Sequence, residues 1–275
     1  MRILASQIAA ACALLVQCSA HAADLPEILE RGTLRVAVSP LAPFVIKGED
    51  GAYTGFEIDA TGALAAMLGV EVDYVETPFC SLGDVIVEGQ ADIVASGYSN
   101  IAARRSALAF SLPYHDSEYV LALSKPAAKR ARTMRGINRK DISIGYQQGG
   151  VSGEVAKAEF AGANLKAFSS FPEIVAALKA GEIDGAVLFS PYDEAATKLK
   201  SPRYIIPHEF PLTRTIEAFA LQQDAEELRD AINGWIIEKD LEGYWDDLEE
   251  KWFDPDQMMM SARPAEQCKS LTPTG

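Results

Sequence analysis

Two adjacent arginines, Arg104 and Arg105, carry the side chain that is best matched to a carboxylate. A planar guanidinium offers paired N–H donors that fit both oxygens of a carboxylate, whereas a lysine ammonium acts as a point charge. The residue type alone leaves a second interpretation open, in which either arginine is a solvated surface charge. Anion binding is therefore one hypothesis for this position.

Two short polar segments would complete such a site. Ser96-Gly97-Tyr98-Ser99 follows a buried apolar run, and loops at the carboxyl ends of parallel strands are where α/β folds bind ligands. Gly150-Val151-Ser152 opens a predicted helix, whose free N–H groups can meet a carboxylate. The same glycine-rich turn also fits an ordinary connection between a strand and a helix.

The common signatures of catalysis are absent from this sequence. There is no Gly-x-Ser-x-Gly elbow, no His-Glu-x-x-His pair and no phosphate loop. Beyond the N-terminal segment only His115 and His208 occur, in different segments and with no cysteine nearby. We therefore expect no metal site and no cofactor, and a binding protein rather than an enzyme.

Short apolar runs that alternate with amphipathic helices predict the frame for these residues. Strands are expected at 33–38 and 70–75, with a helix between them that begins near Phe56 and ends at Gly69. The buried face of that helix is expected to carry Phe56, Ala60, Leu64, Met67 and Leu68. The alternation predicts α/β lobes with largely parallel sheets.

The second half continues the pattern. Strands are expected at 118–123, 141–146 and 218–221, and the basic segment 129–140 is expected to be a surface connection. Asp224 and Glu227 predict a capping box for a long helix, before a last helix at 244–252.

One unit of local structure occurs twice. Residues 82–94 and 174–187 each read as a helix, a glycine, then an aspartate followed by a buried strand. This is a common way to join a helix to a parallel strand, so coincidence is an alternative. Two copies about ninety residues apart nevertheless fit two lobes of similar construction.

The N-terminus and the charge predict the compartment and exclude partners. Arg2, the apolar run 3–16 and the small-x-small site ending at Ala22 predict a cleaved signal peptide over residues 1–22, and a periplasmic protein. A membrane anchor would need about 20 apolar residues, and lipidation at Cys18 is disfavoured by the large Gln17 before it. Removing Arg2 takes the net charge from −14 to −15, so nucleic acid is not an expected partner.

Two cysteines, Cys80 and Cys268, remain after the predicted cleavage. An even number in an oxidising compartment makes one disulfide between them a hypothesis. Sequence cannot show that the two Cβ atoms meet, so a pair of free thiols is the alternative.

With these elements in order, the chain resembles the periplasmic solute-binding proteins of the polar amino-acid type, family 3. The resemblance covers nearly the whole mature chain and rests on six pieces in the right order. They are 34–38 leading to Pro43-Phe44, 55–59, 89–94, Arg104 with 109–114 behind it, 181–184, and Gly243-Tyr244 with 251–253.

The resemblance implies a two-lobed α/β fold of the periplasmic-binding-protein type (type II) with two hinge segments. Residues 23–123 and 216–275 would form lobe 1, and residues 124–215 would form lobe 2. Ligand would bind between the lobes and favour a closed form.

The resemblance also implies the site. Arg104 would fork onto the ligand's carboxylate, Arg105 would face solvent, and Phe79 would form an aromatic wall. The full expected set of ligand-binding residues is Arg104, Ser99, Ser96, Gly97, Phe79, Phe44, Leu41, Gly150, Val151 and Phe189.

Three departures from the family pattern bear on the ligand. Phe189 stands where the family usually has an Asp for the ligand's α-ammonium, Leu41 replaces a frequent aromatic, and Val151 replaces a threonine. An unpaired buried ammonium costs several kcal/mol. The ligand would therefore be a carboxylate without a free α-amine, or Asp193 would substitute for the missing Asp.

The function implied is the substrate-binding component of an ABC importer for an amino acid or related small carboxylate, with a membrane permease as partner. The alternative is an enzyme on the same fold that resembles cyclohexadienyl dehydratase, because Phe79, Tyr98, Phe189 and Tyr192 predict an aromatic-rich pocket. A receptor's sensor domain is disfavoured, since nothing after residue 253 resembles a membrane span.

Overall fold

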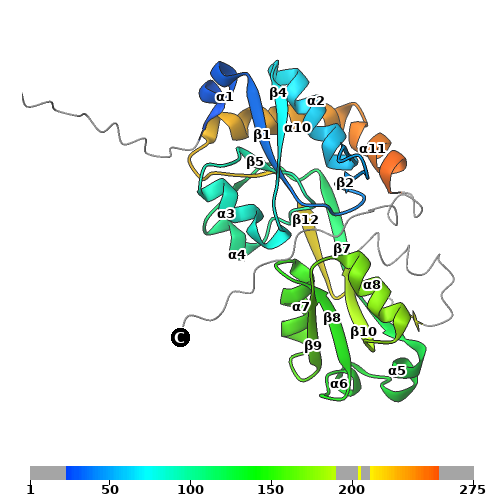
Figure 1. Ribbon diagram of the computed structural model, residues 1–275. Helices are drawn as coiled ribbons and strands as arrows, with labels where there is room; N and C mark the ends of the chain where they lie inside the picture. The colour runs from blue at the N-terminus through cyan, green and yellow to red at the C-terminus, as the bar shows by residue number, and fades with distance from the viewer. Residues whose placement is uncertain (1–22, 190–203, 206–210, 254–275) are drawn as a thin grey trace, which may run out of the picture.

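The computed structural model describes residues 23–189, 204–205 and 211–253. Within them, two β-sheets form two α/β lobes that the chain links twice (Figure 1). The predicted signal segment 1–22 lies outside the described residues, as do Asp193, Tyr192, His208 and Cys268.

The first lobe is built from both ends of the chain around a five-stranded sheet in the order β4-β1-β5-β13-β6. Its elements are α1 (Leu25–Arg31), β1 (Thr33–Val38), β2 (Ile46–Lys47), β3 (Tyr53–Thr54), α2 (Phe56–Leu68), β4 (Glu71–Glu76), the 3-10 turn η1 (Phe79–Ser81), α3 (Leu82–Val87), β5 (Ile93–Val94), α4 (Ala102–Arg105), β6 (Ala109–Phe110), β13 (Ala220–Leu221), α10 (Glu226–Leu241) and α11 (Tyr244–Trp252). β1 runs parallel to β4 and β5, whereas β13 runs antiparallel to β5 and β6.

The second lobe has a six-stranded sheet in the order β11-β7-β10-β8-β9, with β12 paired to β7. Its elements are β7 (His115–Ser124), α5 (Lys125–Arg130), α6 (Met134–Ile137), β8 (Ser143–Gln147), α7 (Val151–Glu159), β9 (Asn164–Phe168), α8 (Phe171–Ala180), β10 (Gly185–Phe189), β11 (Tyr204–Ile205) and β12 (Thr213–Glu217). β8 is parallel to β9 and β10, so both lobes have the predicted parallel core.

The two links between the lobes are neighbours. β7 and β12 pair antiparallel from Thr213↔Tyr119 to Glu217↔His115, and they lie between the lobes in Figure 1. All of β7 (residues 115–124) belongs to the second sheet. The predicted lobe boundary had instead placed residues up to 123 in lobe 1. The division of the moving units at 123/124 and 215/216 remains a prediction.

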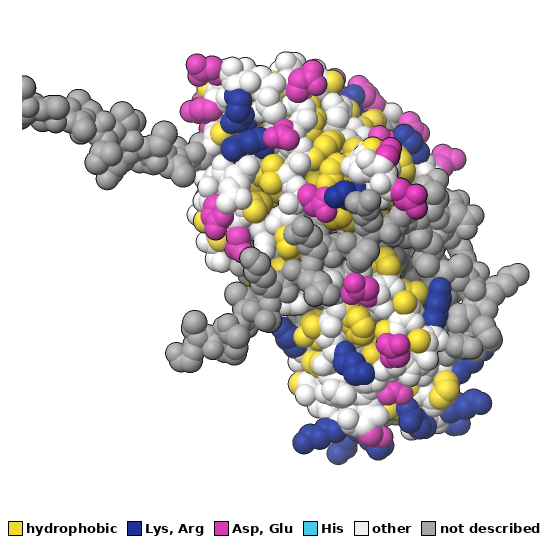
Figure 2. Space-filling view, in the orientation of Figure 1, with side chains coloured by type: hydrophobic (Ala, Val, Ile, Leu, Met, Phe, Trp, Pro, Cys, Tyr) yellow, Lys and Arg dark blue, Asp and Glu magenta, His cyan; other side chains and the backbone are white. Residues whose placement is uncertain are grey.

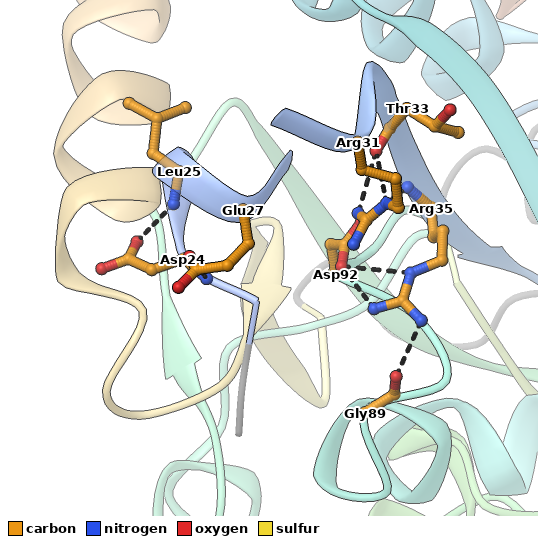
Figure 3. Close-up of polar contacts among 8 residues, drawn as sticks. All are labelled: Asp24, Leu25, Glu27, Arg31, Thr33, Arg35, Gly89 and Asp92. Carbon is orange, nitrogen blue, oxygen red and sulfur yellow. Dashed lines mark hydrogen bonds and ion pairs between the residues drawn. The ribbon is translucent and has the colours of Figure 1, made fainter. Parts of the chain in front are cut away.

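The aspartate of the repeated sequence unit makes the same backbone contact in both lobes. Asp92 comes before β5, and its carboxylate accepts the Arg35 backbone N–H (2.7 Å) and pairs with the side chains of Arg35 and Arg31, at 2.7 and 2.5 Å (Figure 3). Asp184 comes before β10, and its carboxylate accepts the Ser143 backbone N–H (3.0 Å). Each aspartate thus anchors the neighbouring parallel strand at its start.

Two details of the helices differ from expectation. Met67 on α2 is 47% exposed, because the buried face of α2 runs through Glu57 and Thr61. The predicted capping box at Asp224 is wrong, since α10 has no side-chain cap of its own. Asp24 supplies that cap: its carboxylate accepts the Leu228 N–H (2.7 Å) while it also caps α1.

The basic segment lies at the surface as predicted, although its residues form α5 and α6. Arg132, Arg135 and Lys140 are among its exposed cations. Blue side chains gather at the far end of the lower lobe in Figure 2, and acidic ones are frequent on the upper lobe. No helix in the part of the chain that the structure describes is long and apolar enough to cross a membrane.

Candidate functional site

A narrow cavity lies where the two lobes meet. Its walls enclose about 280 Å³ between their atoms, openings to solvent included. The centre of a water molecule can reach only about 10 Å³ of this space, which is roughly what one water needs. The lobes are therefore close together over the cavity.

Most of the residues predicted for the site line this cavity. Those from the first lobe are Leu41, Phe79, Gly97, Ser99 and Arg104, and those from the second are Gly150, Val151 and Phe189. Segments separated by more than a hundred residues are thus brought together, as a site between lobes requires. Their role in ligand binding remains a prediction.

Two predicted residues, Ser96 and Phe44, do not line the cavity. The Ser96 hydroxyl donates to the Ser39 carbonyl (2.6 Å) and accepts from the Ser39 N–H (3.0 Å), so it ties the end of β5 to the end of β1. Phe44 is buried against Phe56 and Phe189, with ring centroids 5.9 and 6.2 Å away. Both are structural supports of the cavity wall.

Arg104, on α4, reaches across the cleft. Its guanidinium lies 3.7 Å from the centroid of the Tyr98 ring and donates to the Ser99 carbonyl (2.8 Å). A third contact, 3.1 Å to the Gly149 carbonyl, joins the first lobe to the second. These bonds use two of five N–H donors, and no further hydrogen-bond acceptor for it occurs among the described residues; the Phe79 ring centroid lies 5.9 Å away. Arg105 is exposed and bonds Asn100.

The start of α7 faces the same cavity from the second lobe. Gly150 is its N-cap and makes no side-chain cap bond. The Gly153 N–H donates to the Gly150 carbonyl (3.0 Å), whereas the N–H groups of Val151 and Ser152 keep their donor capacity. Gly150 and Val151 both line the cavity. A half-buried guanidinium on one side and a helix N-terminus on the other form an arrangement that suits an anion.

Gly149 allows the lobes to approach. Its φ is +76°, and a Cβ at this position would lie 2.7 Å from both Cα and Cβ of Cys80 in the first lobe. Only glycine satisfies this backbone conformation and this spacing together. The predicted pairing of Cys80 with Cys268 stays a prediction, because Cys268 lies outside the described residues.

A buried carboxylate, Glu217, also lines the cavity. It is 1% exposed and accepts hydrogen bonds from the hydroxyls of Ser99, Ser117 and Thr215, each at 3.1 Å. Burial raises the pKa of Glu217 to about 7, although nearby His115 and the three hydroxyls oppose the rise. The cavity therefore holds an acidic group as well as Arg104.

A second buried carboxylate, Glu57, supports the cavity from behind. It lies in the first turn of α2, accepts the Gly97 N–H (2.8 Å) and is hydrogen-bonded by the Tyr114 hydroxyl. Burial raises the pKa of Glu57 to about 8, against the opposing effect of these two hydrogen bonds. Glu57 thereby fixes the loop that carries Gly97 and Ser99.

These two acids predict that stability falls as pH rises. Folded Glu57 and Glu217 keep protons that the unfolded chain releases near pH 4.5, so their contribution is complete below that pH and is lost as pH rises through about 7–8. We expect the free energy of unfolding to fall by about 1–3 kcal/mol between pH 5 and 8. Urea titrations across this range measure it, and Glu57→Gln should flatten the profile. Stability that rises over this range in the wild type would contradict the prediction.

Sequence reasoning missed five residues of the cavity wall: Ser117, Tyr119, Gln147, Phe171 and Glu217. Glu217 had a usable signal, because an acid stands directly before the apolar run 218–221. The strand that carries it, β12, was not predicted. As for metals, no group of three or more His, Cys, Asp or Glu in the described ranges is arranged to hold an ion.

Comparison with known proteins shows the family of this chain. The sequence profile of the bacterial extracellular solute-binding proteins, family 3, matches residues 34–255. The chain belongs to this family. A family 3 relative, the probable histidine-binding protein of Campylobacter jejuni, is 30% identical over 224 residues, which are 80% of this chain and 84% of that protein.

A solved structure and an enzyme are also similar to this family 3 chain. The crystal structure of the ancestral amino acid-binding protein AncCDT-1, a precursor of cyclohexadienyl dehydratase, superposes with a TM-score of 0.76 at 31% identity, covering 84% of this chain and 99% of that one. The predicted two-lobed fold is thereby confirmed. Cyclohexadienyl dehydratase of Pseudomonas aeruginosa is 34% identical over 164 residues, 58% of this chain and 59% of the enzyme.

Proposed function

We propose that this family 3 protein is the periplasmic substrate-binding component of an ABC importer, and that it closes its two lobes around an amino acid or a related small carboxylate. The observation that carries the proposal is Arg104, which lines the cavity and already bonds Gly149 across the cleft. The uncapped start of α7 opposite it offers further donors for a carboxylate.

The remaining parts of the proposal concern the protein's surroundings. A cleaved signal peptide over residues 1–22 would deliver the protein to the periplasm, and a membrane permease would receive the ligand from the closed form. An oxidising periplasm would allow Cys80 and Cys268 to form a disulfide. The role as a solute-binding protein is supported by similar proteins such as the probable histidine-binding protein of Campylobacter jejuni.

Arg104→Ala tests the carboxylate site. We expect ligand affinity to fall about 10- to 100-fold, since a hydrogen bond to a charged group contributes about 1.5–3 kcal/mol. The ligand is first sought by native mass spectrometry of protein purified from its own host, then by thermal shift with a carboxylate panel. Calorimetry then compares wild type with the variant. Arg105→Ala, at the exposed neighbour, is the control. Equal affinities in wild type and Arg104→Ala would remove Arg104 from the site.

A second candidate, a dehydratase, is favoured by one observation. Glu217 stands in the same cavity as Arg104, and its pKa near 7 gives a carboxylic acid that can donate a proton at neutral pH. The similarity to cyclohexadienyl dehydratase supports keeping this reading. Incubation with prephenate decides it: phenylpyruvate formation that Glu217→Gln abolishes would establish the enzyme, and an absence of product would dismiss it.

A further inference from the structure

Glu217 is a buried acid with an incomplete set of partners. A carboxylate has about four lone-pair directions, and the hydroxyls of Ser99, Ser117 and Thr215 occupy three of them. No lysine, arginine or histidine in the described part of the chain lies within ion-pair distance of Glu217. Because Glu217 lines the cavity, a cation placed there could complete its coordination.

Ser99 holds Glu217 and Arg104 close to one another. Its carbonyl accepts from the Arg104 guanidinium at 2.8 Å, and its hydroxyl donates to the Glu217 carboxylate at 3.1 Å. Tyr119 also lines the cavity: burial raises the pKa of its phenol, the Glu217 charge raises it further, and the Arg104 charge lowers it. Arg104 and Glu217 are therefore both hydrogen-bonded to Ser99, and they do not form an ion pair with each other.

We propose that Glu217 is the ammonium-binding subsite of this cavity, so that the ligand is an α-amino acid whose carboxylate meets Arg104 and whose ammonium meets Glu217. This inference rests on the proposed binding function and names its ligand class. An α-amino acid carries both charges on one carbon, which matches two groups tied to one residue. A ligand with a carboxylate alone would leave Glu217 without a cation.

The proposal explains how the cleft can accept an amine although Phe189 stands at the expected acidic position. Phe189 packs on Phe171 and Tyr119, with ring centroids 4.7 and 6.0 Å away, and so belongs to an aromatic wall. The acid comes from β12 of the second crossing instead. The cavity thus contains a carboxyl group although Phe189 is not acidic.

Other ionisable groups surround Glu217 on α2, on β7 and in the loop before β7. His115 on β7 lowers its pKa, and Glu57 on α2 has its own pKa raised by the Glu217 charge. Tyr114 and Tyr119 are close as well: burial raises the pKa of both phenols, and the Glu217 charge adds to the rise. None of them is a cation within bonding distance, so a ligand ammonium would be the first.

The test compares amino acids with their deaminated partners. The probes are the twenty standard L-amino acids and, for each that binds, the same molecule with hydrogen in place of the α-amino group, such as 3-phenylpropanoate for L-phenylalanine. We expect at least one amino acid to bind, and its deaminated partner to bind about 10- to 100-fold more weakly, the range of one charge-assisted hydrogen bond. Equal or tighter binding of deaminated acids overturns the inference and leaves the carboxylate-binding function standing. Failure of both series overturns both.

Variants assign the effect to the residue. Glu217→Gln keeps the size of the side chain and one acceptor oxygen but carries no negative charge, and we expect it to remove the preference for the amine. Glu118→Gln neutralises an acid on β7 that pairs with Arg214 and does not line the cavity, and it should retain the preference. A preference that survives in Glu217→Gln would overturn the assignment.

A measurement on the wild type keeps the test independent of folding of the variant. Burial raises the pKa of Glu217 to about 7, so part of the population carries a proton near neutral pH, and a bound ammonium favours the ionised form. Calorimetry in buffers of different ionisation enthalpy should therefore show proton release on binding an amino acid. Amino-acid binding with no proton release between pH 6 and 8 would contradict the proposal.

Discussion

Asp92→Ala is expected to lower the free energy of unfolding by about 2–4 kcal/mol. The variant leaves Arg31 and Arg35 without their shared carboxylate and removes the acceptor of the Arg35 N–H. Breaking a buried ion pair costs about 3–5 kcal/mol; the two guanidinium groups are 33% and 25% exposed, so water can solvate them and the loss is smaller. Urea denaturation followed by tryptophan fluorescence measures it.

The second lobe provides the matched control. Asp184 occupies the same place before its strand, but it is 25% exposed and its partner Arg130 is 55% exposed. Asp184→Ala should therefore cost only about 1 kcal/mol. If the two variants lose the same stability, burial of Asp92 is not the source of its contribution.

Gly149→Ala is expected to weaken ligand binding about 100-fold. The new methyl group would lie 2.7 Å from Cys80 across the cleft, and an alanine at φ +76° is strained. Overpacking costs about 1–3 kcal/mol, and it acts on the closed form, in which the two residues meet. Calorimetry measures the affinity, and small-angle scattering with saturating ligand shows whether the protein still compacts.

Gly181→Ala separates closure from backbone strain. Gly181 has nearly the same φ, +78°, and lies in the same lobe, with no atom near its Cβ position. This variant should lose a similar backbone contribution to stability and keep its ligand affinity. Loss of affinity in both variants would show that strain within the second lobe, rather than contact between lobes, limits binding.

The spacing of apolar residues and the positions of glycines predicted the helices whose buried face is visible within one segment of sequence. The apolar stripe Leu228, Ile232, Trp235 and Ile236 of α10 is buried, and Gly69 and Gly181 end their helices in the left-handed conformation. The strands β9 and β12 escaped prediction, because β9 is short and has no buried residue and β12 alternates without a strong apolar face. Their place is set by pairing with distant strands, which a single sequence does not reveal.

The same reason separates the predicted from the missed parts of the site. Ser99 and Val151 could be found because they follow a recognisable strand and open a recognisable helix, and Arg104 because the family resemblance implies its role. The roles of Ser96, Phe44 and Glu217 depend on what lies opposite them in space: Ser39 for Ser96, Phe56 for Phe44, and three hydroxyls for Glu217. The cap of α10 follows this rule too, since Asp24 provides it from more than two hundred positions away.

The position of β13 has a consequence for the order in which the protein can fold during synthesis. This strand lies between β5 and β6, yet it is made about 110 residues after β6. A nascent chain that has emerged only as far as the second lobe therefore has a gap in its first sheet and cannot seal that core. For the exported protein that we propose, we expect the first lobe to complete its core only after β13 has been synthesised.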